Sequence, residues 1–162
     1  LGTVTAGNLS NSAIVYPAGH VIQTRIYSTG SQVNITATSF NTSDVVGDFQ
    51  FTPLKASSNI LLWACCTIYS NTAASYTFTD FYKNASDVTE TTNLSGHTHG
   101  LTVNHHDGDW QTCTFFFLDT CAENSLSEKT YKISGKTNGV GSGYLGWGAA
   151  TPAKMVIQEI TT

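Results

Sequence analysis

Apolar and polar residues alternate along most of this chain. Residues 33–38, 49–52, 131–134 and 155–160 carry apolar side chains at about every second position. A period of two places one face of a β-strand against a core and the other in water, whereas a helix repeats its apolar positions every three to four residues. The pattern predicts an all-β protein whose chemistry lies on loops, sheet edges or subunit contacts.

Turn-forming residues divide this pattern into short segments that fit a two-sheet jelly-roll (Greek-key) sandwich. Residues 1–19 are rich in Gly, Ser and Asn and end in Pro-Ala-Gly, so we expect a connector from an upstream region, followed by a head domain over residues 20–162. The predicted strands cover residues 20–27, 31–40, 47–52, 59–69, 76–82, 111–118, 129–136, 144–147 and 154–161.

Three segments need a separate interpretation. Residues 60–68 and 115–118 are continuously apolar. Such segments are typical of central strands buried on both faces, or of strands whose outer face meets another subunit. Residues 83–110 form an unusually long connection, in which we expect residues 101–103 to belong to a further strand.

The charge of the chain restricts its partners. Only 11% of the 162 residues are charged, against roughly 25% in a typical soluble domain. A net charge of -4 with seven Lys and Arg residues argues against nucleic-acid binding, which needs clustered basic side chains. No apolar run of about 18 residues predicts membrane insertion. A surface of Thr, Ser and Asn suits packing against copies of the same chain.

The four cysteines do not suggest a disulfide framework. Cys65 and Cys66 are neighbours, so their side chains point to opposite faces of a strand. Cys113 and Cys121 flank an apolar segment that, if extended, separates their Cα atoms by about 20 Å. A disulfide needs roughly 4.4–6.8 Å between Cα atoms. We therefore expect four reduced thiols.

Five segments are informative when taken together: 2–10 (GTVTAGNLS), 14–23 (IVYPAGHVIQ), 51–61 (FTPLKASSNIL), 114–119 (TFFFLD) and 155–160 (MVIQEI). They resemble segments of the carboxyl-terminal module of phage tail-fibre virion proteins. The resemblance implies a trimeric fibre-end domain, similar to jelly rolls of the tumour-necrosis-factor or C1q type, and it supplies no catalytic residues. Cys65-Cys66 and a histidine-rich loop depart from the family pattern.

That loop holds the candidate metal site. His97 and His99 lie two residues apart, followed by His105, His106 and Asp107. If the first two histidines lie on a strand, they share one face, and a trimer axis would gather three such pairs around one metal ion. No other cofactor is expected. The alternative is an exposed polar loop whose histidines form local hydrogen bonds.

The candidate ligand-binding residues are Trp110, Tyr144 and Trp147, of which the last two lie among glycines. Aromatic faces flanked by small residues can stack on sugar rings, and they form rigid recognition surfaces. The alternative is that Trp147 closes one end of the core while the glycines form turns.

No catalytic residue is predicted. The carboxylates that an enzyme could use are Asp107 with Asp109, Asp80, and Asp119 with Glu123. We interpret them as surface acids on turns. Motifs for a nucleophile elbow, a zinc protease or a phosphate-binding loop are absent from the sequence.

These observations favour a non-enzymatic phage virion fibre domain that trimerises and presents loops to a host surface glycan or protein. Its other partners would be virion fibre or baseplate proteins, and it would be assembled in the host cytoplasm and exposed on the particle. One alternative is a tailspike-like head that cleaves polysaccharide, which turnover of host polysaccharide would reveal. Another is a secreted carbohydrate-binding β-sandwich, which glycans at Asn84 or Asn93 would reveal.

Overall fold

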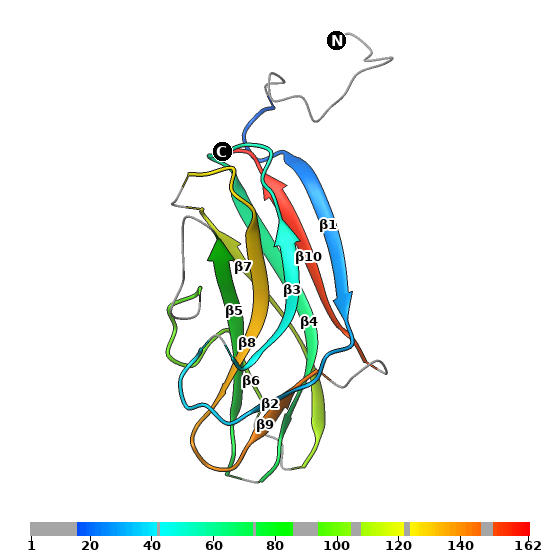
Figure 1. Ribbon diagram of the computed structural model, residues 1–162, viewed down its shortest axis with the longest axis vertical. Coiled ribbons are helices and arrows are strands. Elements are labelled where there is room, and N and C mark those ends of the chain that lie inside the picture. The colour runs from blue at the N-terminus through cyan, green and yellow to red at the C-terminus, as the bar shows by residue number, and fades with distance from the viewer. Residues whose placement is uncertain are drawn as a thin grey trace.

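The computed structural model describes residues 16–41, 43–72, 74–85, 94–104, 108–121, 124–146 and 151–162. Within these ranges the chain forms ten strands and no helix, in two antiparallel sheets packed face to face (Figure 1). The strands are β1 (Val21–Thr29), β2 (Val33–Ile35), β3 (Val45–Phe51), β4 (Asn59–Ser70), β5 (Thr77–Ala85), β6 (Thr102–Asn104), β7 (Trp110–Asp119), β8 (Lys129–Thr137), β9 (Gly143–Leu145) and β10 (Ala153–Ile160). The predicted all-β sandwich is confirmed.

The order of the strands is that of a jelly roll. In the larger sheet, β1, β10, β4 and β7 lie side by side, and the short β9 and β2 extend one end of it beside β4. The second sheet has the order β3-β8-β5-β6. Because the chain passes repeatedly from one sheet to the other, strands distant in sequence become neighbours, as in double Greek-key jelly rolls.

Side chains from the two inner faces form one core. In β4, the inward Ile60, Leu62 and Ala64 are fully buried, while the outward Trp63 is half exposed. This is the alternation that the sequence predicted. The second sheet and β10 add large buried side chains, among them Phe51, Phe81, Tyr131, Ile133, Met155 and Ile157.

Two strand predictions need correction. The segment predicted over residues 31–40 is a strand only from Val33 to Ile35. Beyond it, the Asp44 carboxylate accepts hydrogen bonds from the backbone N–H groups of Thr36 (3.2 Å) and Ala37 (3.0 Å), so these groups are satisfied without a strand partner. Of the two alternatives for the segment 115–118, a central strand is wrong, because among the described strands β7 pairs with β4 alone and so lies at the sheet edge.

The two ends of the described domain meet. The backbone N–H of Gly19 donates to Thr161 O (2.8 Å), and the N–H of Thr161 donates to His20 O (2.9 Å). Residues 1–15, most of the predicted connector, lie outside the described residues. No helix in the described ranges is long and apolar enough to cross a membrane.

Candidate functional site: an aromatic platform

Three aromatic rings meet on the outer face of the larger sheet, at its β2–β9 end. The ring centroid of Tyr69 lies 5.0 Å from that of Trp110 and 5.7 Å from that of Tyr144, and the last two lie 6.1 Å apart. All three side chains are partly exposed. We call this cluster the aromatic platform. The structure therefore brings together two of the three predicted ligand-binding residues.

The strand register creates the platform. Tyr69 of β4 lies directly opposite Trp110 of β7 on one side and opposite Tyr144 of β9 on the other. Directly opposed residues of an antiparallel pair lie on the same face. Tyr69 is the member that sequence reasoning missed, because its role depends on a pairing between distant strands.

Steric constraints explain why position 143, beside the platform, is a glycine. A Cβ atom at Gly143 would lie 2.0 Å from Thr77 Oγ1 and 2.8 Å from Tyr69 O. The absence of a side chain lets β9 approach β4 closely enough to place Tyr144 against Tyr69. Gly143 thus helps to position the Tyr144 ring.

Polar groups border the platform. Asn34 of β2 is exposed and lies opposite Tyr144, so an amide extends the row of rings at one edge. Beyond the end of β4, Asn71 Nδ2 donates to Ser142 Oγ (2.9 Å), and Ser142 N donates to Asn71 Oδ1 (2.9 Å). Rigid rings beside amides and hydroxyls are the functional groups that recognise a sugar by stacking and hydrogen bonding. Trp147, the third predicted residue, lies outside the described residues.

The two predicted metal ligands lie in a turn and not on a strand. Gly100 N donates to His97 O (3.0 Å), and Gly96 and Gly100 both adopt positive φ, which breaks an extended conformation. The His99 ring packs against Phe78 at 5.3 Å. The shared strand face expected for His97 and His99 is therefore wrong. Among the described residues, no three His, Cys, Asp or Glu side chains gather as a metal site. His105, His106 and Asp107 lie outside them.

Two of the carboxylates interpreted as surface acids are buried. Asp80 accepts hydrogen bonds from Phe81 N (2.6 Å) and from the Ser95 hydroxyl. Asp119 lies at the end of β7, where the alternating pattern turns its side chain toward the core. Asp109 is exposed, as predicted. Asp107 and Glu123 lie outside the described residues.

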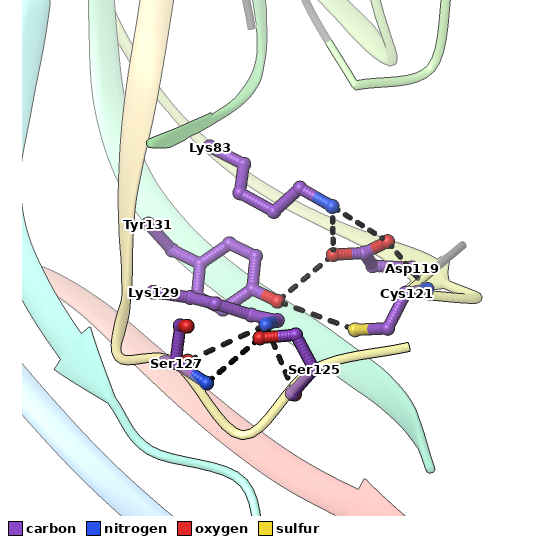
Figure 2. A network of polar contacts seen from close by, with 7 residues as sticks. All are labelled: Lys83, Asp119, Cys121, Ser125, Ser127, Lys129 and Tyr131. Carbon is purple, nitrogen blue, oxygen red and sulfur yellow. Dashed lines mark hydrogen bonds and ion pairs between the residues drawn. The ribbon is translucent and has the colours of Figure 1, made fainter. Parts of the chain in front are cut away.

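Asp119 is the centre of a buried polar network (Figure 2). Its carboxylate forms an ion pair with Lys83 Nζ (3.1 Å) and accepts hydrogen bonds from the Tyr131 hydroxyl (2.8 Å) and Cys121 N (2.9 Å). Nearby, the fully buried Lys129 donates to backbone carbonyls. Burial, followed by the neighbouring Asp119 carboxylate, raises the pKa of Tyr131 well above its usual value. The network joins β5, β7 and β8 and satisfies charges that the core would otherwise exclude.

A groove of about 600 Å³ lies between the edges of β1 and β3. Arg25, Asp48 and Glu128 are among the residues that line it. Two side chains of β1 form hydrogen bonds to the opposite wall of the groove. The Tyr27 hydroxyl donates to Gln50 O, and Gln23 Nε2 donates to Thr52 O. Asp48 and Glu128 are not among the carboxylates weighed from the sequence, and Asp48 Oδ1 forms an ion pair with Lys132 Nζ (2.7 Å).

The cysteines include a close pair. Cys66 of β4 lies directly opposite Cys113 of β7, with 3.8 Å between the Sγ atoms. Their mutual hydrogen bond raises the pKa of Cys66 well above its usual value, an effect that burial reinforces, and it lowers the pKa of Cys113. Sequence reasoning compared cysteines along single strands and so missed a pair that only strand register creates.

No protein-family model matches the chain, and no curated protein matches it. Among solved structures, the chain is similar to a chain in the structure of infectious bursal disease virus Gx strain. The two are 12% identical with a TM-score of 0.40, and the match covers 86% of this chain and 37% of that chain. A chain in the structure of the Gt strain of the same virus is 16% identical, with a TM-score of 0.41, and the match covers 97% of this chain and 41% of that chain. A chain in the crystal structure of the VP2 subviral particle of this virus is also 16% identical, with a TM-score of 0.38, and the match covers 97% of this chain and 42% of that chain.

This chain thus spans about two fifths of the length of these solved chains. Their TM-scores lie below 0.5, so the fold assignment rests on the strand pairing of this chain itself.

Proposed function

We propose that this domain is a non-enzymatic virion fibre module, a homotrimer that attaches the particle to a host surface glycan through the aromatic platform. The observation that carries the proposal is the contact of Tyr69, Trp110 and Tyr144 on the outer face of a sheet, with Asn34 at the edge. Strand pairing holds these rings in place before any ligand arrives. Preorganised aromatic surface loses little entropy on binding and is typical of recognition sites.

The location of the platform supports attachment. The chain enters β1 and ends after β10 at one end of the sandwich, while β2 and β9 lie at the opposite end (Figure 1). A module joined through residues 1–19 to other virion fibre or baseplate proteins would therefore present the platform away from the particle. The resemblance to tail-fibre modules supports a virion location, and jelly rolls serve both viral capsids and lectins. The latter is an argument from analogy of fold.

The test is binding of the purified protein to a printed array of mono- and oligosaccharides, followed by titration of the best-bound sugar. Replacing Trp110 with Ala should weaken binding at least 10-fold, because one stacked aromatic ring contributes about 2 kcal/mol or more at a recognition hot spot. Leu126→Ala is the matched control, since it also removes an exposed apolar side chain but lies outside the platform. Equal affinity of the Trp110→Ala variant and the wild type would overturn the proposed site.

The same preparation separates attachment from cleavage. We expect no release of reducing ends from isolated host polysaccharide. Sustained release that Asp48→Asn or Glu128→Gln abolishes would instead assign the protein as a tailspike-like enzyme acting in the β1–β3 groove.

Trimer formation is supported by an exposed apolar row across the larger sheet. Ile26, Val156, Trp63 and Phe116 lie opposite one another on β1, β10, β4 and β7. Ile26, Trp63 and Phe116 are 75%, 52% and 65% exposed, and the adjacent Leu118 is 43% exposed. Lys154 is the one charged residue that faces outward on these four fully described strands.

The size of the row suits a contact between copies. At roughly 200 Å² for each large side chain, the exposed fractions of these four residues amount to on the order of 500 Å² of apolar surface. A stable interface buries about 800 Å² on each partner, of which roughly 60% is apolar, so the two values agree. Because this face is almost uncharged, copies that gather around a trimer axis would meet there without repulsion between like charges. We therefore propose that further copies of this chain cover the row.

Sedimentation tests this contact. The wild type should sediment as a trimer at micromolar concentration, and Phe116→Glu should produce folded monomers because each contact would then bury a charge without a partner. Val140→Glu, which places the same charge at another exposed apolar position, should leave the trimer intact. A wild-type protein that sediments as a stable folded monomer contradicts trimer formation.

A further inference from the structure

The facing thiols of Cys66 and Cys113 have the arrangement of a disulfide before oxidation. They are directly opposed residues of the antiparallel pair β4–β7, and their Sγ atoms are 3.8 Å apart. Opposed residues in antiparallel strands have Cα atoms about 4.5–5.5 Å apart, which lies within the range that disulfides span. Closing the remaining distance requires rotation of side chains and no change of register.

We propose that Cys66 and Cys113 are a built cross-linking site, at which a low-molecular-weight disulfide such as oxidised glutathione oxidises the two thiols to a cross-strand disulfide. The other two cysteines do not offer this geometry. Cys65 faces outward and lies opposite Thr114 and Lys154, and the buried Cys121 has its Sγ atom beside the Tyr131 hydroxyl. The inference rests on strand geometry alone and is independent of the proposed function.

The difference in burial assigns the order of the steps. Cys113 is partly exposed on the edge strand, so its thiolate attacks one sulfur of the small disulfide. This breaks the small disulfide, releases one thiolate and leaves a mixed disulfide on Cys113. Cys66, buried beside it, then loses its proton to solvent and attacks Cys113 Sγ, which expels the second small thiol. Two protein thiols are oxidised, and one small disulfide is reduced to two thiols.

The pKa directions agree with this order. The hydrogen bond from Cys66 favours the thiolate of Cys113 and lowers its pKa, whereas the same bond and burial raise the pKa of Cys66. The attacking thiol is therefore the one that ionises first, as thiol–disulfide exchange requires.

The cross-link would stabilise the free edge of the larger sheet. It would join residues 47 positions apart, and closing a loop of this length restricts the unfolded chain substantially. A reducing cytosol keeps such thiols reduced, whereas surroundings outside the cell permit the bond. The protein would thus have two covalent states, and the redox compartment would decide between them.

The test uses the full chain, purified in reductant, freed of it, incubated with oxidised glutathione under native conditions and quenched in acid. Titration in denaturant should then find that the thiols fall from four to two per chain. Peptide mapping without reductant should recover one cross-linked pair that contains Cys66 and Cys113. The Tm of the oxidised protein should rise by about 5 °C or more.

Variants make the result specific. Cys66→Ser should stop the reaction at a stable glutathione adduct on Cys113, and Cys113→Ser should leave Cys66 reduced. The double variant Cys65→Ser/Cys121→Ser retains the proposed pair and should still lose both of its thiols. Four thiols remaining in the folded wild type, while unfolded protein reacts in the same solution, would overturn the proposal. A cross-linked peptide that contains Cys65 or Cys121 would overturn it as well.

Discussion

The buried ion pair between Lys83 and Asp119 gives the sharpest prediction about stability. The two side chains are only 4% and 7% exposed, with 3.1 Å between Lys83 Nζ and Asp119 Oδ2. Asp119→Asn removes this carboxylate from beside a buried ammonium group, which should lower the free energy of unfolding by about 3–5 kcal/mol. Lys83→Met leaves the carboxylate with its bonds from Tyr131 and Cys121 N, so its cost should be smaller, roughly 2–3 kcal/mol.

The double variant separates an ion pair from two independent side chains. Lys83→Met/Asp119→Asn removes both charges together, so the loss should be only about 1–2 kcal/mol, and the two substitutions should be coupled by at least about 3 kcal/mol. Urea unfolding followed by fluorescence and by circular dichroism measures all four proteins. Losses below 1 kcal/mol for both single variants, or losses that simply add, would refute the inference that the charges are paired and buried.

Three further predictions concern packing, pH and a buried carboxylate. Gly143→Ala should lower the free energy of unfolding by about 2 kcal/mol or more, because a Cβ there would collide with Thr77 Oγ1 and Tyr69 O, whereas Gly96→Ala meets no atom within 4 Å and reports only the cost of its positive φ. Urea midpoints that fall equally would contradict the collision. The pKa of Tyr131 is raised on folding, so the folded state holds its proton longer, and stability should be complete below about pH 10 and fall above it by up to about 1.4 kcal/mol per pH unit. Tyr131→Phe should remove that part of the alkaline slope, and an unchanged slope would show that Tyr131 does not cause it. Glu159→Ala should cost about 2–4 kcal/mol in urea unfolding, because the buried carboxylate accepts hydrogen bonds from Leu54 N and Lys55 N, and a cost below 0.5 kcal/mol would show that water replaces it.

The alternation of apolar residues was sufficient to predict the strands, because burial of one sheet face is a local property of sequence. Each predicted segment contains a strand, including the one expected at residues 101–103. Errors arose where a distant group changed the outcome. Asp44 ends β2 early through its hydrogen bonds to Thr36 N and Ala37 N, and nothing within residues 31–40 indicates this.

The site was predictable only in part for the same reason. Trp110 and Tyr144 stand out as aromatic residues in polar or glycine-rich segments, but Tyr69 looks like an ordinary residue of a buried strand until β7 and β9 flank it. Cys66 and Cys113 face each other through the same β4–β7 register. Cross-strand pairing carries the chemistry of this protein, and sequence periodicity does not encode which strands pair.

The platform and the apolar row lie on one face of one sheet, and this suggests how they act together. Trp63 precedes Tyr69 by six residues on β4, and Phe116 follows Trp110 by six residues on β7, so the two surfaces are about 20 Å apart along the strands. If copies pack through the row, each trimer presents three platforms at one end. Several weak sites on one particle bind a surface far more tightly than a single site does.

Phe116→Glu therefore should separate the two contributions. Monomers of this variant should bind a soluble oligosaccharide with the wild-type Kd, since the platform is unchanged, while their retention on a glycan-coated surface should fall by roughly 100-fold through loss of avidity. Trp110→Ala trimers should lose both kinds of binding. If Phe116→Glu monomers are retained on the coated surface as strongly as wild-type trimers, then the trimer does not serve attachment through multivalency.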